Sequence, residues 1–273
     1  MTLSPNRFYL HEYAHQPVDS AFLGMTFGPF GSRFDRMNTL AKQSVGWSQH
    51  IAKLSLLLQN VVKVTEVSCL AGEEPSASLV ITYNSPYLVP LQYQADIFSR
   101  VNLLNTIVIN KRASYSSGTS YSRLVFPDFL SASATTVSKV LELAQGGVPI
   151  LLLCTSVPSR AIRLNDSSAD VISIVNKLWF IAGNGNVFVG NTITAVLSTI
   201  GPTPDLTFTS SSNNVAIYFS HKAPGGENLC SVGNGLRKPV EAVLSLQGVG
   251  IPEIWDPLTG EMTVICVASV SGG

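Results

Sequence analysis

The sequence predicts a protein of the α/β plus β class, and three observations lead to that prediction. Residues 61–201 alternate apolar, strand-like runs with helix-like segments, which is the order of a doubly wound parallel sheet. From residue 202 onward, short strands are separated by turn sequences such as APGGEN and DPLTGE, which is typical of an antiparallel β-sandwich. Residues 1–60 hold one strand, one loop and one helix, a single βα unit that needs neighbouring strands to bury its faces.

In residues 1–60, the expected strand is RFYLHEY, and the Gly- and Pro-rich loop HQPVDSAFLGMTFGPFGSRFDR follows it. Asn38 or Thr39 can cap the next helix, in which apolar residues repeat at three-to-four spacing from Leu40 to Leu58. Nothing before this unit supplies the strands that it would pack against.

Residues 61–201 are expected to form a flavodoxin-like α/β domain. The predicted strands are VVKVTEVSCLAG, NTIVINKRA, YSRLVFPDF, VPILLLC and NVFVG. The predicted helices are YQADIFSRVNLL, SASATTVSKVLELAQGG, SSADVISIVNKLWFIAG and NTITAVLSTIG. The second of these helices has a Ser cap and a Gly-Gly stop, and VPILLLC is as uniformly apolar as a buried parallel strand should be.

Residues 202–273 are expected to form a β-sandwich that is incomplete, because five strands are few for a closed one. These strands are VAIYFSHK, NLCSVGN, EAVLSLQG, PEIWDP and MTVICVASV. WDPLTGE indicates a structural turn, in which Asp256 and Pro257 start the turn, Gly260 completes it and Trp255 packs in the sandwich.

The charge balance argues against nucleic acid and membrane partners. Charged residues are 12% of the chain, about half the usual share, and 17 basic residues offset 17 acidic ones. No basic face or polybasic run is present. The longest apolar run, VPILLLC, is too short to span a bilayer, and no segment near the N-terminus has the order of a signal peptide. The oligomeric state is left open.

The four cysteines, at 69, 154, 230 and 266, form no close pair, so a zinc site is not expected. Cys69 and Cys154 fall in apolar strands and are expected to be buried thiols. A disulfide between Cys230 and Cys266 remains an alternative to two free thiols, because the distance between them cannot be read from the sequence.

HEYAHQP, residues 11–17, is the first candidate for a binding site. His11 and His15 could share a helix face as zinc ligands do, but Glu12 is out of the HExxH register and Pro17 follows at once. On an extended strand end these two side chains also point the same way and could line a substrate pocket. Local hydrogen bonding without function is the third interpretation.

Two other stretches are candidate binding loops. Residues 24–36 have three glycines and the cations Arg33 and Arg36 but no phosphate-binding pattern, so a pocket wall and a salt-bridged surface loop are both possible. Glu73 and Glu74 follow the first strand of the α/β region, where ligands often bind, although a solvated loop is the favoured interpretation. No nucleophile motif is present, and Asp170 and Asp205 have no partner that the sequence reveals.

Five of these stretches, taken in order, resemble one family. HEYAHQP, GMTFGPFGSRFDRMNT, the helix after it, VTEVSCLAGEEP and IPEIWDPLTGE are similar to segments of the α-L-rhamnosidases of glycoside hydrolase family 106, over roughly residues 5–265. The resemblance implies that residues 1–60 are the last strand, loop and helix of a catalytic (β/α)8 barrel. It also implies that the α/β domain and the sandwich follow that barrel.

The resemblance further implies an inverting hydrolase for rhamnose-containing oligo- or polysaccharides, with its catalytic acid and base on earlier barrel strands. No catalytic residue and no metal ligand is therefore assigned in this chain. The residues carried over as substrate-binding candidates are His11, His15, Gln16 and Arg36. Calcium and an extracellular location are properties that the family implies, without ligands or a signal peptide here. The alternative is a non-enzymatic module that binds a carbohydrate or another partner.

Overall fold

The structure is a computed structural model. It describes residues 38–59, 61–73, 89–90, 92–126, 131–154, 159–182, 185–211, 217–223, 227–248 and 250–265, together with residues 8, 20 and 215.

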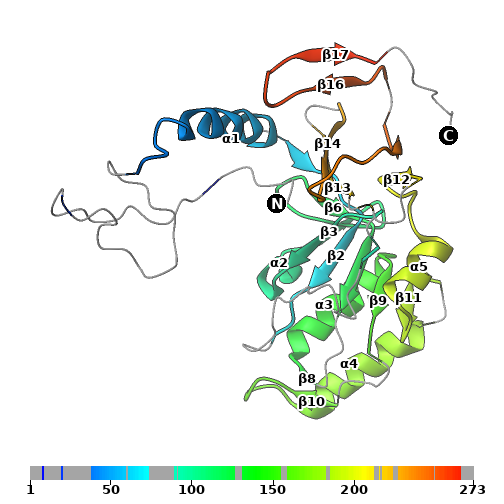
Figure 1. The fold of residues 1–273 in the computed structure, drawn as a ribbon. Coiled ribbons are helices and arrows are strands. Elements are labelled where there is room, and N and C mark those ends of the chain that lie inside the picture. The colour runs from blue at the N-terminus through cyan, green and yellow to red at the C-terminus, as the bar shows by residue number, and fades with distance from the viewer. Residues whose placement is uncertain are drawn as a thin grey trace.

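A five-stranded parallel sheet is the centre of the molecule (Figure 1). Its strands, from one edge to the other, are β11 (Val187–Val189), β9 (Ile150–Leu152), β7 (Arg123–Phe126), β2 (Val67–Leu70) and β3 (Ala95–Phe98). Numbered along the chain, these five strands lie in the order 2-1-3-4-5, and the order reverses between β2 and β7. All four neighbouring pairs are parallel.

Helices cover both faces of this sheet, so its strands are buried on both sides. The helices α2 (Arg100–Leu104), α3 (Ala134–Gln145) and α4 (Ser168–Ile181) lie over one face. Their apolar side chains pack there against alternate strand residues such as Leu124 and Ile150. The helix α5 (Ile193–Ile200) covers the other face, against the intervening residues Val67, Val125 and Leu151.

The helix caps explain where these helices begin. The Ser133 hydroxyl accepts a hydrogen bond from the Thr136 amide at the start of α3, and Ser167 does the same for Ala169 at the start of α4. At the end of α3, Gly147 has a φ of +84°, a conformation that favours glycine. The Ser cap and the Gly-Gly stop predicted for α3 are therefore confirmed.

The helix predicted over YQADIFSRVNLL is wrong in its first half. Ala95–Phe98 is the edge strand β3, which pairs in parallel with Val67–Leu70. Helix begins only after Ser99, which caps α2 through the Asn102 amide. Pairing with the neighbouring strand decided the conformation of Ala95–Phe98, whose single polar side chain, Asp96, masks the alternation typical of strands.

Two predicted strands are each divided in the structure. NTIVINKRA is a hairpin of β4 (Ile107–Ile109) and β5 (Arg112–Ser114), which turns at Asn110 and Lys111 with φ values of 52° and 60°. The strand β6 (Ser120–Tyr121) completes this three-stranded sheet. VVKVTEVSCLAG gives β2 and a separate short strand, β1 (Val62–Lys63), which joins a different sheet.

The C-terminal region is antiparallel, as predicted, but its strands form several small sheets. The strand β1 pairs with β13 (Ile217–Ala223), which pairs with β14 (Leu229–Asn234). The strand β12 (Leu206–Thr209), which was not predicted, pairs with β15 (Val243–Leu246), and β16 (Glu253–Trp255) pairs with β17 (Met262–Val264). A short parallel pair, β8 (Ser131–Ala132) and β10 (Arg160–Ala161), lies beside α4.

The turn at WDPLTGE is confirmed, but the environment expected for Trp255 is wrong. The Asp256 carboxylate accepts a hydrogen bond from the Leu258 amide, and the Gly260 amide donates to the Asp256 carbonyl. Trp255 is 45% exposed, and its indole N–H donates to Glu253 on the same strand. The exposed indole is explained by β16–β17 being a two-stranded sheet, which leaves little apolar surface over Trp255.

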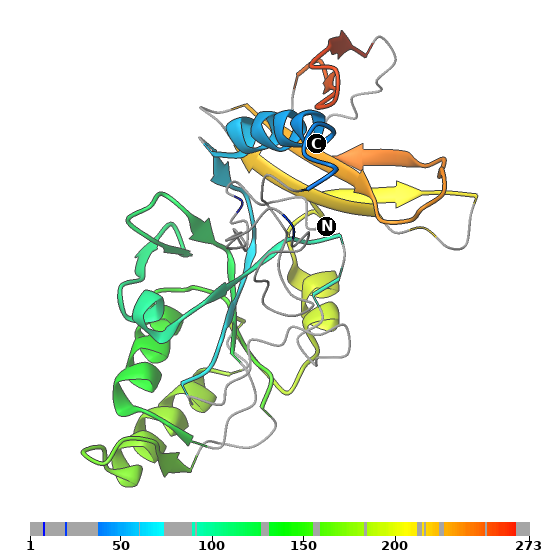
Figure 2. The same ribbon diagram turned by 60° about the vertical axis from the view of Figure 1, so that its left-hand side comes forward.

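The long helix predicted after residue 38 is α1 (Ser44–Gln59), and turns occupy residues 39–43. Asn38 accepts from the Leu40 amide within these turns rather than capping α1. The helix lies against the turn between β16 and β17, where His50 and Lys53 contact the carbonyls of Pro257 and Leu258. Figures 1 and 2 show α1 and the antiparallel strands at one end of the parallel sheet.

The cysteines that the structure describes are all free of disulfide bonds. Cys69 and Cys154 are buried, as predicted, and Cys230 is half-buried. Cys266 lies outside the described residues. Burial and the nearby Asp96 carboxylate raise the pKa of the Cys69 thiol to about 12, so this thiol is inert at neutral pH.

Candidate functional site

The substrate-binding residues predicted from the sequence, His11, His15, Gln16 and Arg36, all lie outside the residues that the structure describes. So does the glycine-rich loop at residues 24–36. The structure neither brings these residues together nor separates them, and their assignment stays a prediction.

The reversal of strand order between β2 and β7 is where open α/β sheets usually bind ligands, beyond the carboxyl ends of the strands. Glu73 follows β2 at this point. Its side chain is only 6% exposed, and its carboxylate lies 3.4 Å from Nε of Arg100 and 3.2 Å from the Ser133 amide that donates to it. The solvated loop favoured for this residue is therefore wrong.

Arg100 fills the rest of this edge of the sheet beside Glu73. Its guanidinium donates to the hydroxyls of Ser133, Thr135 and Thr136 in addition to its ion pair with Glu73. Every group in the cluster thus has a partner within the chain. The arrangement stabilises the junction of β2, α2 and α3, and it holds no unpaired acid for proton transfer.

The amino end of α3 is satisfied in the same way. The Asp166 carboxylate accepts a hydrogen bond of 2.8 Å from the Ala134 amide. The neighbouring Ser133 amide donates to Glu73. Carboxylates are favoured here by the exposed amides and the dipole of the helix. The position that an external anion would take in a ligand-binding α/β domain is filled by two of the chain's own side chains.

A second buried cluster lies at the other end of the parallel sheet, centred on His221 of β13. The Nδ1 atom of His221 is 3.4 Å from an Asp205 carboxylate oxygen, and the Nε2 atom is 2.7 Å from the amide oxygen of Asn228. The side chains of His221 and Asp205 are 4% and 1% exposed. The hydrogen bond to Asp205 raises the pKa of His221 above its ordinary value, against the opposing effect of burial.

Cys230 is the direct cross-strand neighbour of His221, so the cluster contains the residue types of a Cys-His-Asp triad. The geometry does not support that chemistry. The Nε2 atom of His221, which would take the proton of a nucleophile, is bonded to Asn228. Burial and the Asp205 charge also raise the pKa of the Cys230 thiol, the opposite of what activates a nucleophile.

A third cluster links the antiparallel strands to the parallel sheet. Lys63 of β1 forms an ion pair with Asp96 of β3, and the Tyr121 hydroxyl donates to the same carboxylate. Burial, with Asp96 close by, raises the pKa of Tyr121 well above its ordinary range. Glu66, which precedes β2, and Arg112 of β5 form an ion pair with two hydrogen bonds. These contacts are structural, since each charged group is paired.

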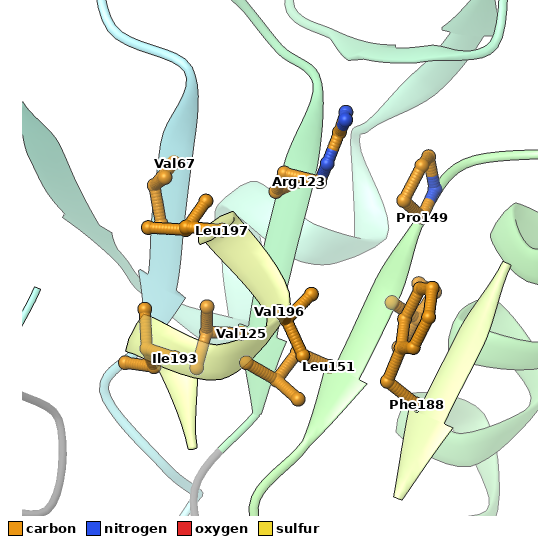
Figure 3. Close-up of a pocket in the computed structure, with 10 residues that line it drawn as sticks. Val67, Arg123, Val125, Pro149, Leu151, Phe188, Ile193, Val196 and Leu197 are labelled. Atoms are coloured by element: carbon orange, nitrogen blue, oxygen red, sulfur yellow. The ribbon is translucent and has the colours of Figure 1, made fainter. Parts of the chain in front are cut away.

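A small cavity lies between the parallel sheet and α5 (Figure 3). Its volume, about 10 Å³, is close to that of one water molecule. The lining is apolar apart from Arg123, whose guanidinium points away from the side chains of Val125, Leu151 and Val196. A space of this size without convergent polar groups is a packing defect rather than a substrate pocket.

Within the described residues, no group of three or more His, Cys, Asp or Glu side chains could hold a metal ion. None of the helices that the structure describes is both long and apolar enough to cross a membrane.

The fold and these clusters together define an α/β plus β protein. The chain's own side chains fill the carboxyl edge of its parallel sheet, and polar contacts hold the antiparallel strands at the other end. The chain belongs to the alpha-L-rhamnosidase family of glycoside hydrolases, family 106, whose model matches residues 1–269. The resemblance seen in the sequence is thereby confirmed. The sequence signal for this membership was the ordered set of motifs rather than any catalytic residue.

Two comparisons place the chain among larger proteins. A rhamnosidase from Novosphingobium sp. PP1Y has a similar fold, with a TM-score of 0.80 and 23% identity over 96% of this chain. A protein from Formosa agariphila named "Putative beta-glucuronidase" is 27% identical over 177 residues, 63% of this chain. The chain spans only 26% of the Novosphingobium protein and 14% of the Formosa protein.

Proposed function

We propose that this chain forms part of an α-L-rhamnosidase-type glycoside hydrolase that acts on rhamnose-containing oligosaccharides or polysaccharides. The observation that carries the proposal is the family match over residues 1–269, almost the whole chain. The fold shared with the Novosphingobium rhamnosidase supports it, although this chain corresponds to about a quarter of that protein.

The proposed organisation has three parts: residues 1–60 as the end of a catalytic (β/α)8 barrel, residues 61–201 as a flavodoxin-like domain, and residues 202–273 as a truncated β-sandwich. The strand order 2-1-3-4-5 supports the second part, because flavodoxin-like sheets have this order. The helix α1 supports the first part. Its side chains Val45, Trp47 and Leu56 are about half exposed or more, as expected of a helix that packs against further strands.

The catalytic acid and base are proposed to lie on earlier strands of the barrel, outside this chain. An inverting hydrolase needs one protonated and one ionised carboxyl group, roughly 6.5–9.5 Å apart around the scissile bond. The buried or half-buried carboxylates in the described residues are already engaged: Glu66 with Arg112, Glu73 with Arg100, Asp96 with Lys63, Asp166 with α3, Asp205 with His221 and Asp256 with the Leu258 amide. This engagement supports a scaffolding role for residues 61–265.

The contribution of this chain to substrate binding is proposed to come from His11, His15, Gln16 and Arg36. Loops that follow barrel strands collect binding residues, which is the reason to place HEYAHQP at the rim of the sugar pocket. Neutral imidazole, amide and guanidinium groups can all bond sugar hydroxyls. Export of the whole protein, by analogy with family members that act on external polysaccharides, is part of the same proposal.

A second candidate function is a non-enzymatic module that binds a glycan or a protein partner. The observation that favours it is the self-contained core of the parallel-sheet region. Three clusters of buried apolar side chains lie entirely within residues 61–201. A region that buries its own core can fold and act independently of a catalytic barrel.

The first function can be tested on the native protein, captured from source cells and their medium with an antibody raised against residues 202–273. We expect the captured protein to hydrolyse an aryl α-L-rhamnoside and to leave an aryl β-D-glucuronide intact. Hydrolysis of the glucuronide alone would move the proposal to the activity in the name of the Formosa relative. Hydrolysis of neither substrate, with glycan binding retained, would favour the binding module.

A further inference from the structure

The imidazole of His221 has an oxygen atom in front of each of its ring nitrogens: a carboxylate oxygen of Asp205 and the amide oxygen of Asn228. A neutral imidazole carries one N–H, so it can donate to only one of these oxygens, and its other nitrogen would face an acceptor. The protonated ring donates to both. The arrangement of the two oxygens therefore selects the charged form of His221.

His221 lies at a polar seam between the antiparallel strands and the parallel sheet, formed by Lys63, Gln94, Asp96, Asp205 and His221. Asp205 uses its second carboxylate oxygen to accept from the Gln94 amide, just before β3, at 3.4 Å. The Gln94 side chain donates to the Phe219 carbonyl of β13. The Asp205 carbonyl accepts from the Gln247 amide, just after β15. The Asp205 carboxylate thus joins β13 to the start of β3, and the Asp205 backbone joins both to the end of β15.

We propose that His221 is a protonation-dependent latch that fastens β13 to Asp205 and, through Asp205, to the start of β3. In the protonated state both ring nitrogens donate, and Asp205 is held in the orientation that bonds the Gln94 amide. When the ring loses the proton on Nδ1, its hydrogen bond to Asp205 is lost, because Nδ1 and the carboxylate oxygen then face each other as two acceptors. The seam then loosens without unfolding of the parallel sheet.

The other groups around the ring do not replace this function. From β14, Cys230 faces His221, and its raised pKa keeps the thiol neutral across the physiological range. From β1, Lys63 directs its ammonium group to Asp96. The segment before β3 contributes Gln94, which is uncharged, and Gln247 contributes only its backbone. Asp205 is therefore the charge paired with the ring among the described residues.

The direction of the pH effect follows from linkage. The pKa of His221 is raised in the folded state, so the folded protein binds its proton more tightly than the unfolded chain does. The contribution of the latch to stability is complete below the ordinary histidine pKa of about 6.5. It is lost as the pH rises through the raised value.

The direct test is ¹⁵N NMR of the full chain labelled at histidine, with signals assigned through the variants His11→Gln, His15→Gln and His50→Gln. The remaining signal belongs to His221, so the assignment does not depend on a His221 variant that folds. We expect both ring nitrogens of His221 to be protonated at pH 6, with a titration midpoint above 6.5. A ring with one unprotonated nitrogen at pH 6 would overturn the proposal.

Amide hydrogen exchange supplies the structural readout. We expect the protection factor of the Gln94 amide to fall with the NMR midpoint of His221 as the pH rises. The Ile150 amide, bonded within the parallel sheet to the Asn186 carbonyl, is the internal control and should keep its protection. Protection of Gln94 that does not change across the midpoint would rule out the latch, whereas equal loss at both amides would indicate global unfolding and rule it out as well.

Discussion

Glu73 shows at the scale of a single residue how this protein fills the sheet edge at which open α/β sheets usually bind ligands. Its carboxylate joins β2 to α2 through Arg100 and to α3 through the Ser133 amide. The sequence could place Glu73 after a strand, but it could not reveal partners 27 and 60 positions away. The same limit applies to Asp205 and His221, which are 16 positions apart and meet only when β13 is in place.

Substitution of Glu73 by Ala should lower the free energy of unfolding by about 2–3 kcal/mol, because it leaves the Arg100 guanidinium half-paired and the Ser133 amide without its acceptor. Urea unfolding followed by circular dichroism measures this change. Glu142→Ala is the matched control, because Glu142 is 60% exposed and its pair with Lys139 lies on the surface. That variant should change stability by no more than about 0.5 kcal/mol. Equal effects of the two variants would contradict a structural role for Glu73.

At the scale of elements, the sequence predicted best where local chemistry and tertiary structure agree. The helices α3, α4 and α5 each follow a Ser or Thr cap, and β9 is uniformly apolar. The prediction failed for β3. A helix was predicted there because Asp96 obscures the alternation that would mark a strand. The prediction also missed the turn at Asn110 and Lys111, which lacks the glycine that usually marks a two-residue hairpin.

That turn gives a prediction for the β4–β5 hairpin. Lys111 has a φ of 60°, which is costly for a residue with a Cβ atom, so Lys111→Gly should stabilise the protein by about 0.5–1 kcal/mol. Gly118→Ala in the next turn of the same sheet is the opposite control. Its φ of +86° and open surroundings mean that strain alone should destabilise the variant by roughly 1 kcal/mol. Thermal unfolding measures the change in stability of each variant. A destabilised Lys111→Gly protein would contradict the prediction and show that the Lys111 side chain stabilises the fold by more than its backbone strain destabilises it.

At the scale of the whole molecule, the described residues form a scaffold. The carboxyl edge of the parallel sheet is closed by Glu73, Arg100 and Asp166, and the polar seam fixes the antiparallel strands at the opposite end. Family membership was predictable from ordered motifs that span the chain, and the family match confirms it. The substrate-binding role of His11, His15, Gln16 and Arg36 stays a prediction.

We propose that this chain supports a rhamnosidase-type active site without supplying its acid and base. The most direct measurement is the hydrolysis of an aryl α-L-rhamnoside by the purified 273-residue chain, compared with the native protein captured through residues 202–273. We predict that the chain alone releases aglycone no faster than a buffer blank, while the captured protein turns the substrate over. Enzyme-like turnover by the purified chain would contradict the claim and would place a catalytic pair of carboxylates within these residues.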